Sequence, residues 1–422
     1  MRSALRRVLI IVQNLPVPFD RRVWLEATTL ARNGYSVSVI CPKAKGFNAS
    51  QEVLEDVHIY RYGLPIDAHG ALGYLMEFVY CWLATAILSL KIAFAGPGFD
   101  VIQACNPPDT YWLLGWLWRP LGKKFVFDHH DLSPEMYGVK FDRNGGLLYK
   151  ALLWLERRSF RAADVVMTTN ESHKRIAQER GGKRAEDVYV VRSGPDLSRF
   201  RIYPNDPKYA RGKSHLLVYL GEMCKQDGVD NMVRAIKHLR DDLGRKDFFC
   251  LFVGGGPHQP AIERYAQAQG VMDIAAFTGR VSDNELCRIL SSATLGIDPD
   301  PKNPWSDKST MNKVIEYMYF GLPVVAYDLH ETRVSAGSAG AYALPNEESE
   351  LAKAICSLLD QAETRKRMGE VAKARVRDSL AWDHSIPVLL AAYEHVFKGS
   401  APQHRIAAND AQSEIRVASP GE

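Results

Sequence analysis

Apolar runs and helical periodicities alternate along the first 192 residues, and this alternation predicts the fold. Short apolar runs typical of buried strands lie at Val8–Val12, Ser36–Cys41, Val101–Ala104, Lys124–Asp128, Val165–Thr169 and Val188–Arg192. Between the first two runs, apolar residues recur at helical spacing, and we expect a helix that begins after the N-cap Asp20 and ends at Gly34. Further helices are expected at Trp112–Trp118, at Leu147–Ala162 and from Glu171. Such an order predicts a parallel sheet with helices on both faces.

A polar, proline-containing segment from Ser193 to His215 interrupts the alternation and predicts a linker. Strand-like runs then return at Leu216–Tyr219, Phe249–Val253, Ala275–Thr278, Leu295–Ile297 and Val324–Tyr327. Helical periodicity separates these runs and continues in three C-terminal helices, expected at Glu347–Asp360, Ala362–Ser379 and Asp383–Phe397. The second half therefore predicts another parallel α/β sheet.

The predicted fold class is α/β, with two doubly wound Rossmann-like domains that face a cleft. We expect the first domain at residues 1–195, a linker at 196–213, the second domain at 214–380 and a final helix at 381–398. The polar tail 399–422 is expected to be disordered. Because such folds bind ligands at the carboxyl ends of their strands, the functional residues are expected there.

Length, charge and cysteine usage narrow the class of protein. A chain of 422 residues is too long for one core. Lysine and arginine number 53 against 49 acidic residues, a net charge of +4 that argues against a nucleic-acid partner but suits anionic small molecules or an acidic membrane surface. The seven cysteines are scattered and form no CxxC pair, which argues against disulfides and a cysteine zinc site and favours a reducing cytoplasm.

The turn after the first strand of each half lacks a dinucleotide fingerprint. These turns read NLPVPFDR and LGEMCKQDGVD, whereas a nicotinamide site needs GxGxxG. The sequence also contains no GxxxxGK[ST] loop and no HExxH motif. A nicotinamide-dependent enzyme is therefore not expected.

The stretch before KVIEYMYFG carries the richest chemistry. Ser309 and Thr310 stand in the first turn of an expected helix, where free N–H groups favour a phosphate, and Lys313 adds a positive charge. Asn312, Lys313 and Glu316 share one helix face because of their spacing. A carboxylate about one turn beyond bound phosphates could accept hydrogen bonds from ribose hydroxyls. The pattern indicates a nucleoside diphosphate site, or equally a solvated helix with Lys313 paired to Glu316.

A second group of polar residues follows the strand Lys124–Asp128, in the sequence DHHDLSPE. A histidine at the carboxyl end of a strand could hold a sugar hydroxyl or a phosphate oxygen, or could simply pack and hydrogen-bond locally. Adjacent side chains diverge, so His129, His130 and Asp131 alone make a poor metal site.

Glycines follow two strands of the second half. Gly254, Gly255 and Gly256 end one strand, and Gly221 ends another, with Lys225 close behind. Glycine lets the backbone approach a ligand closely, although an ordinary tight turn uses it as well.

Together these motifs resemble the family 4 glycosyltransferases of the GT-B type, in their bacterial polysaccharide branch. The resemblance spans Val8 to about Lys398 and rests on FDRRVWLEATTLARNGYSVSVICP, DHHDLSPE, FVGGGP and, most specifically, NKVIEYMYFGLPVVAYD. It implies two domains with the nucleotide-sugar donor on the second and the acceptor on the first. It also implies that the helix after Trp382 crosses back to the first domain.

The resemblance assigns expected roles to individual residues. Glu316 matches the family glutamate that holds the ribose, but the earlier glutamate of that motif is Lys308 here. His130 matches a family histidine near the donor sugar, and Asp20 and Asp131 are the other candidate catalytic residues. The expected donor-binding residues are Ser309, Thr310, Asn312, Lys313, Glu316, Gly221, Lys225, Gly254, Gly255 and Gly256.

What the resemblance implies for the chemistry is a transferase that retains the anomeric configuration and uses neither a metal nor another cofactor. The leaving diphosphate gains negative charge, so positive groups must already point at it. Three other functions stay open: a nucleotide-sugar 2-epimerase of the same fold, a glycoside phosphorylase, and a non-catalytic nucleotide-sugar-binding protein, the last because of Lys308.

Two features indicate the inner face of a membrane and a lipid-linked or polysaccharide acceptor. The apolar segment Tyr74–Ala95 contains the uninterrupted stretch Phe78–Leu90, which Glu77 and Lys91 bound. We expect this stretch of 13 residues to be too short to span a bilayer. The first domain also contains a dense set of basic residues: Arg157, Arg158, Arg161, Lys174, Arg175, Arg180, Lys183 and Arg184. Aromatic and basic residues at an interface favour peripheral binding, although Phe78–Leu90 could equally be a buried helix.

Overall fold

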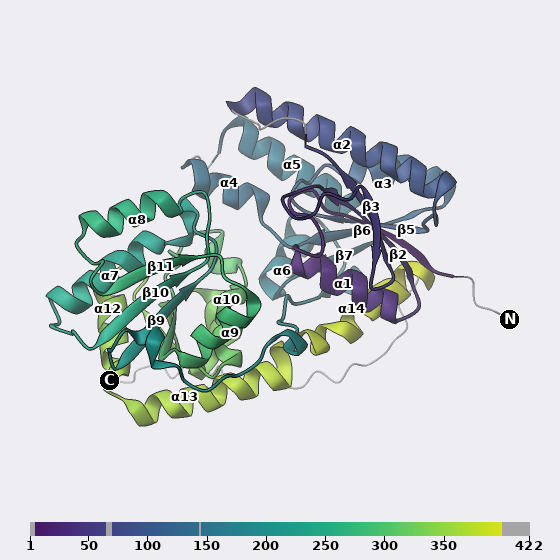
Figure 1. Cartoon of the computed structure of the whole chain (residues 1–422). Coiled ribbons are helices and arrows are strands. Elements are labelled where there is room, and N and C mark those ends of the chain that lie inside the picture. The colour runs from purple at the N-terminus through teal and green to yellow at the C-terminus, as the bar shows by residue number, and fades with distance from the viewer. Residues whose placement is uncertain (1–4, 65–69, 143–144, 399–422) are drawn as a thin grey trace, which may run out of the picture.

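A computed structural model of the chain describes residues 5–64, 70–142 and 145–398 and contains two α/β units (Figure 1). Each unit is built on its own sheet, with helices on both faces. The expected fold class, two Rossmann-like domains, is confirmed. The boundaries at residues 195 and 214 stay predictions, and the tail 399–422 lies outside the described residues.

The first sheet has eight strands in the order β3-β4-β2-β1-β5-β6-β7-β8, all parallel except β3, which pairs antiparallel with β4. The strands are β1 Arg7–Ile11, β2 Ser36–Pro42, β3 Gln51–Leu54, β4 Val57–Tyr62, β5 Val101–Cys105, β6 Lys124–His129, β7 Val165–Thr168 and β8 Val188–Val190. The helices are α1 Arg21–Arg32, α2 Gly70–Ala95, α3 Trp112–Trp118, α4 Ser133–Phe141, α5 Gly146–Ala162 and α6 Glu171–Glu179.

The second sheet has six parallel strands in the order β11-β10-β9-β12-β13-β14. They are β9 His215–Leu220, β10 Phe248–Val253, β11 Ala275–Gly279, β12 Leu295–Asp298, β13 Val324–Tyr327 and β14 Gly340–Ala343. The helices are α7 Val229–Asp241, α8 Gln259–Ala268, α9 Asp283–Ser292, α10 Asn312–Tyr319, α11 His330–Ala336, α12 Glu348–Leu359 and α13 Ala362–Arg375. All six residues of β10 are buried, which explains its continuously apolar sequence, because helices cover both faces.

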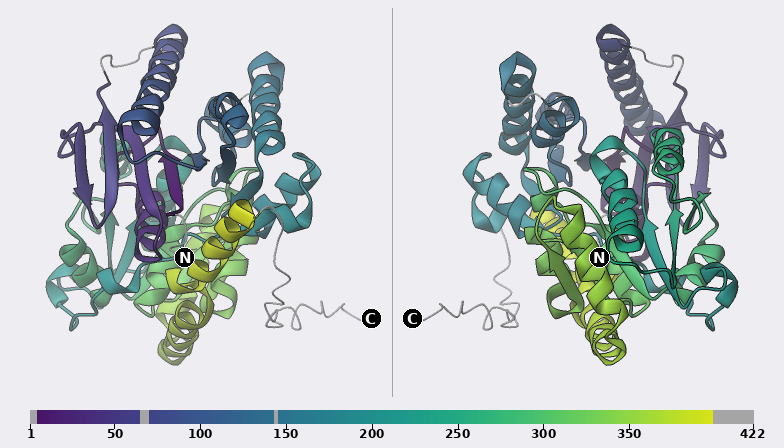
Figure 2. Two further views of the ribbon diagram at one scale, coloured as in Figure 1. Left: turned by 90° about the vertical axis from the view of Figure 1, so that its right-hand side faces the viewer. Right: turned by 90° about the vertical axis from the view of Figure 1, so that its left-hand side faces the viewer.

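The last helix, α14 Trp382–Lys398, joins the two units. It follows α13 and packs in the core of the first unit, where Trp382, Leu389 and Tyr393 are buried beside α1 (Figures 1 and 2). Gly194 lies against the chain at this crossing, since a Cβ there would come within 2.3 Å of the Leu380 carbonyl oxygen. The helix therefore crosses back to the first domain, as the resemblance implied.

Helix α2 differs from its prediction in length. It runs for 26 residues, since Glu77 and Lys91 do not end it. Its stretch Met76–Ala95, with a mean hydropathy of 1.8, is long and apolar enough to cross a membrane by length and composition alone. The expectation that the segment is too short was therefore wrong. In this structure the helix packs along β2 and β4, and only 22% of that stretch is buried.

Candidate active site

A hollow of about 500 Å³ lies at the carboxyl ends of the second sheet's strands and faces the first domain. The predicted donor-binding residues that line it are Gly221, Gly254, Gly255, Thr310, Asn312, Lys313 and Glu316. Phe19 from the β1–α1 loop and Arg21 from the start of α1 close it on the side of the first domain. This hollow, which we call the donor cleft, thus collects most of the residues that the sequence nominated for a nucleotide.

Two predicted glycines allow the loops at the floor of the donor cleft to touch. A Cβ on Gly254, whose φ is +127°, would lie 1.9 Å from the carbonyl oxygen of Gly221. A Cβ on Gly256 would lie 2.6 Å from the Met223 carbonyl oxygen. Any side chain at these two positions would therefore separate the loops after β9 and β10.

Helix α10 begins at Asn312, so Ser309 and Thr310 precede the helix instead of forming its first turn as predicted. The Ser309 hydroxyl donates to the carbonyl oxygen of Trp305 at 2.8 Å. Asn170 of the first domain donates to the Thr310 hydroxyl at 3.0 Å and to the Lys308 carbonyl oxygen at 2.8 Å. These residues fix the loop before α10 and attach it to the first domain.

The positive charge of Lys313 is compensated inside the protein. Its ammonium group lies 3.3 Å from an Asp298 oxygen and also pairs with Asp300, and both carboxylates are buried. Burial raises the pKa of Asp300 well above its usual range, against the opposing charge of Lys313. Lys313 lines the donor cleft as predicted, but it shares its charge with two acids instead of holding it free for a diphosphate.

Glu316 contacts the first domain. Its carboxylate, only 16% exposed, accepts from the Arg21 guanidinium at 3.3 Å, and Arg21 also pairs with Asp283 at 3.2 Å. Burial raises the pKa of Glu316, and the charge of Arg21 opposes that rise. The alternative interpretation, a solvated pair of Glu316 with Lys313, is not what the structure has, since Glu316 pairs with an arginine of the other domain and Lys313 with two aspartates.

The two adjacent histidines point in different directions. His129 is fully buried, bonds Glu156 at 3.1 Å, and has its pKa lowered to about 3, chiefly by burial. His130 is 19% exposed and places Nδ1 3.2 Å from an Asp128 oxygen. The prediction that adjacent side chains diverge is confirmed, and His129 is the locally packed member of the pair.

The remaining candidates have structural partners. Asp20 caps α1 by accepting from the Val23 amide at 3.1 Å, as its N-cap role predicted. Asp131 accepts from the Trp305 indole at 2.9 Å, which is a contact between the domains. Lys225 is exposed and is not among the described residues that line the donor cleft.

Cys105, Asp128 and His130 lie close enough together to share a metal ion. However, both Asp128 oxygens accept from the Arg22 guanidinium, at 2.6 and 3.0 Å. Burial also raises the pKa of the Cys105 thiol well above its usual range, whereas a metal needs a thiolate. The cation that this cluster fits is the guanidinium.

Sequence reasoning missed several residues of the site. Arg280 lines the donor cleft directly after β11, and its guanidinium lies 5.0 Å from the Phe19 ring centroid. Its position at the carboxyl end of a strand was a usable signal. The side chain of Lys308 lines a second hollow between the domains, beside Arg175 and Asp307, away from the donor cleft.

Comparison with known proteins defines the class. Residues 20–194 match the family described as glycosyl transferase 4-like domain, and residues 214–361 match glycosyl transferases group 1. Together the matches cover most of both α/β units. The chain therefore belongs to the family 4 glycosyltransferases with the GT-B fold, which confirms the resemblance seen in its sequence.

Individual relatives are distant. An alpha-D-kanosaminyltransferase of Streptomyces kanamyceticus is 25% identical over 51% of this chain and 56% of its own length. A glycogen synthase of Mycobacterium tuberculosis is 24% identical over 60% of this chain and 58% of its own length. This chain thus spans a little over half the length of these two relatives.

Solved structures show the same fold over nearly the whole chain. A sucrose-phosphate synthase of Thermosynechococcus elongatus superposes with a TM-score of 0.74 at 19% identity, covering 94% of this chain and all of that one. HepE of Anabaena, solved in complex with UDP, gives 0.67 at 16% identity, covering 93% of this chain and all of that one. At such identities the likeness establishes the fold.

Proposed function

We propose that this chain transfers a sugar, with retention of configuration, from a nucleotide-sugar donor to a lipid-linked or saccharide acceptor in cell-surface glycan synthesis. The observation that carries the proposal is the donor cleft, where Glu316, Asn312 and the Gly254–Gly255 turn meet beside the first domain. The complex of the similar HepE with UDP supports a nucleoside diphosphate as the donor's leaving group.

Three positions would serve the donor. Glu316 would accept hydrogen bonds from the ribose, for which Arg21 must yield its place. The backbone of the Gly254–Gly255 turn would approach the diphosphate closely. Arg280, which lines the same hollow, would supply positive charge as the diphosphate leaves.

The reaction would need no metal. Asp298 and Asp300 form the D-x-D pattern that could hold a divalent ion, but both face Lys313. His130 and Asp131 would lie on the acceptor side of the sugar, because they follow β6 of the first domain. Closure of the domains would bring the acceptor hydroxyl beside the anomeric carbon, and the leaving phosphate oxygen would accept its proton.

The distribution of polar and apolar side chains around α2 supports a lipid-linked acceptor. Its sheet-facing positions include the small, weakly polar Cys81, Thr85 and Ser89, all fully buried. Its outward positions carry large apolar side chains: Leu83 at 51% exposure, Ile87 at 65%, Leu90 at 50% and Phe94 at 76%. A helix that turns its apolar side chains away from the protein core suits a hydrocarbon environment better than water.

Neighbouring elements extend this apolar surface. Trp116 and Leu117 of α3, Leu121 after it, and Leu147 and Trp154 of α5 are all more than half exposed. We call the exposed apolar side chains of α2, α3 and α5 the apolar face. Figure 1 shows these three helices on the same side of the first sheet.

Basic residues of α5 accompany the apolar face. Arg157, Arg158 and Arg161 are exposed on α5, and the Arg158 guanidinium lies 5.0 Å from the Trp112 ring centroid. Arg180 of the predicted set is instead held inside the protein, where it pairs with Glu135 and Glu156. The proposal is therefore peripheral binding of the apolar face to an anionic cytoplasmic leaflet, with α5 supplying the charge.

Incubation with radiolabelled nucleotide sugars tests the function. With a bacterial lipid extract present, we expect label in the organic phase, and the anomeric configuration of the product reports retention. The same donors without acceptor should stay unchanged. Conversion to a C2 epimer would identify the epimerase of this fold, and nucleotide binding without any turnover would identify a binding protein.

A further inference from the structure

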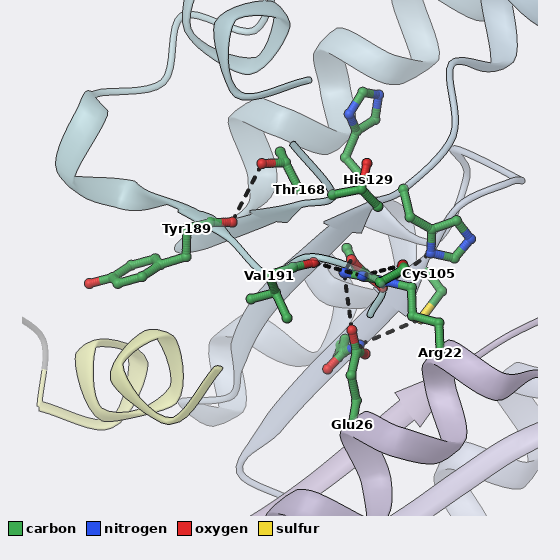
Figure 3. Close-up of polar contacts among 12 residues, drawn as sticks. Arg22, Glu26, Cys105, His129, Thr168, Tyr189 and Val191 are labelled. Atoms are coloured by element: carbon green, nitrogen blue, oxygen red, sulfur yellow. Dashed lines mark hydrogen bonds and ion pairs between the residues drawn. The ribbon is translucent and has the colours of Figure 1, made fainter. Parts of the chain in front are cut away.

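Arg21 and Arg22 are adjacent in sequence, but their side chains lie in different surroundings. Arg21 reaches across the cleft, whereas the Arg22 side chain is only 8% exposed and points into the first domain (Figure 3). There Arg22 donates two hydrogen bonds to the Asp128 carboxylate, one from Nε at 3.0 Å and one from Nη2 at 2.6 Å. The guanidinium thus contacts both carboxylate oxygens in a bidentate arrangement, which lysine cannot reproduce.

Asp128 is shared between Arg22 and His130. The same Oδ2 atom that accepts from Arg22 Nε also accepts from His130 Nδ1 at 3.2 Å. Fixing Nδ1 in this way leaves Nε2 as the nitrogen free for a ligand, and Nε2 has no hydrogen-bond partner among the described residues. The orientation of the His130 ring therefore depends on where Arg22 holds Asp128.

The Nη1 atom of Arg22 bonds the segment where the chain leaves the first domain. Nη1 donates to the Val191 carbonyl oxygen at 2.8 Å and to the Ser193 hydroxyl at 3.0 Å. Immediately after them, Gly194 packs against the returning chain at Leu380. One arginine thus touches both the carboxylate behind His130 and the point where the two domains are connected.

Arg22 also forms an ion pair with Glu26 of the same helix. Nη2 lies 3.1 Å from Glu26, whose other oxygen accepts from Gln103 at 2.6 Å. Gln103 in turn accepts from the Tyr393 hydroxyl of α14. Through Glu26, Gln103 and Tyr393 these polar contacts continue from the guanidinium into the crossing helix.

We propose that Arg22 is a positioning residue of the transfer reaction: it shares the Asp128 carboxylate with His130 and so fixes the orientation of the imidazole beside the donor sugar. The inference rests on the proposed function for its purpose, but its physical content concerns the free protein. No other described side chain bonds both Asp128 and the Val191–Ser193 segment.

Electrostatics supplies the direction of the effect. Burial lowers the pKa of His130, but the hydrogen bond and charge of Asp128 outweigh burial and raise it, while the Arg22 cation opposes that rise. The titratable and charged groups around this pair are Arg22, Glu26 and Asp20 from α1, Cys105 from β5, His129 from β6, His173 from α6 and Tyr393 from α14. Among the described residues, removal of Arg22 leaves only His130 paired with Asp128.

The test is an NMR titration of the free, full-length protein with histidine labelled at Cε1, the His130 signal being assigned with His130→Gln. In Arg22→Met we expect the His130 pKa to rise by about one unit or more, and in Asp128→Asn to fall by a similar amount. Arg32→Met, the same change on an exposed arginine of the same helix, should leave it unchanged.

Arg22→Met leaves two buried carboxyl groups, those of Asp128 and Glu26, without their cation. A second variant therefore guards against a loss of folding in the first. The double variant Arg22→Met/Glu26→Gln also removes the Glu26 carboxyl, whose pKa burial raises to about 8, and should show the same rise. An unchanged His130 pKa in either folded variant overturns the proposal, as does an equal shift in Arg32→Met. Because no substrate enters this measurement, its outcome is independent of whether the transferase function holds.

Discussion

The carboxylate of Glu316 lies 3.3 Å from the guanidinium of Arg21. An arginine of the first domain therefore already pairs with the carboxylate that is expected to hold the donor ribose. A ribose must therefore compete with Arg21. Because Arg21 is 47% exposed, the pair contributes only between zero and about 1 kcal/mol. Arg21→Gln should bind a nucleoside diphosphate up to about fivefold more tightly by calorimetry. Weaker binding would place Arg21 among the donor's ligands instead.

Lys313 is predicted to be essential for stability. Lys313→Met leaves Asp298 and Asp300 buried without their cation, which should cost about 3–5 kcal/mol in urea unfolding. The matched change at exposed Lys353, which pairs only with Glu350, should stay within about 0.5 kcal/mol.

The stability loss in Lys313→Met should depend on pH. Burial already raises the pKa of Asp300, and loss of Lys313 raises it further. A carboxyl whose folded pKa exceeds its unfolded value of about 3.9 stabilises the fold below that value and loses this contribution as pH rises through the folded pKa. The deficit should therefore be larger at pH 8 than at pH 5, and a pH-independent deficit would argue against buried carboxylates as its cause.

Chelation should leave transfer intact. The D-x-D acids hold Lys313, and arginines line the donor cleft, so activity in excess EDTA should stay within about twofold of the untreated enzyme. Complete loss that magnesium or manganese restores would show that a divalent ion does this work.

The apolar face should bind anionic vesicles. We expect the protein to float with phosphatidylethanolamine–phosphatidylglycerol vesicles at low salt, and less so at high salt. Leu83→Glu/Ile87→Glu should fold normally and remain at the bottom of the gradient, since both side chains point outward. Leu344→Glu, at a 62% exposed position of the second domain, should float like the wild type. A wild-type protein that stays at the bottom would contradict membrane binding but not the transferase function.

The sequence was sufficient for the two parallel sheets because their central strands are continuously apolar runs between amphipathic helices. It was insufficient for β3 and β4, since β3 lies at the sheet edge with three of its four residues exposed and therefore lacks an apolar pattern. The apolar run between Glu77 and Lys91 underestimates the length of α2, because single charged residues need not end a helix.

Most of the donor cleft could be predicted because strand ends and the turn before α10 mark it locally in sequence. Its ion pairs could not, since Arg21 and Glu316 are 295 positions apart and meet only through the arrangement of the domains. The pairing of Lys313 with Asp300 was easier to foresee, because Asp300 lies in the DPDP segment after β12 and Lys313 follows 13 positions later, in the first turn of α10.

The central claim, that the donor cleft holds a nucleotide sugar through Glu316, is tested most directly by calorimetry with a panel of nucleoside diphosphates and nucleotide sugars. At least one ligand should bind the wild type. Glu316→Gln, which keeps size but loses charge-assisted hydrogen bonds worth about 1.5–3 kcal/mol, should bind that ligand roughly 10- to 150-fold more weakly. Equal affinity in the two proteins, or no binding of any nucleotide by the wild type, would contradict the account.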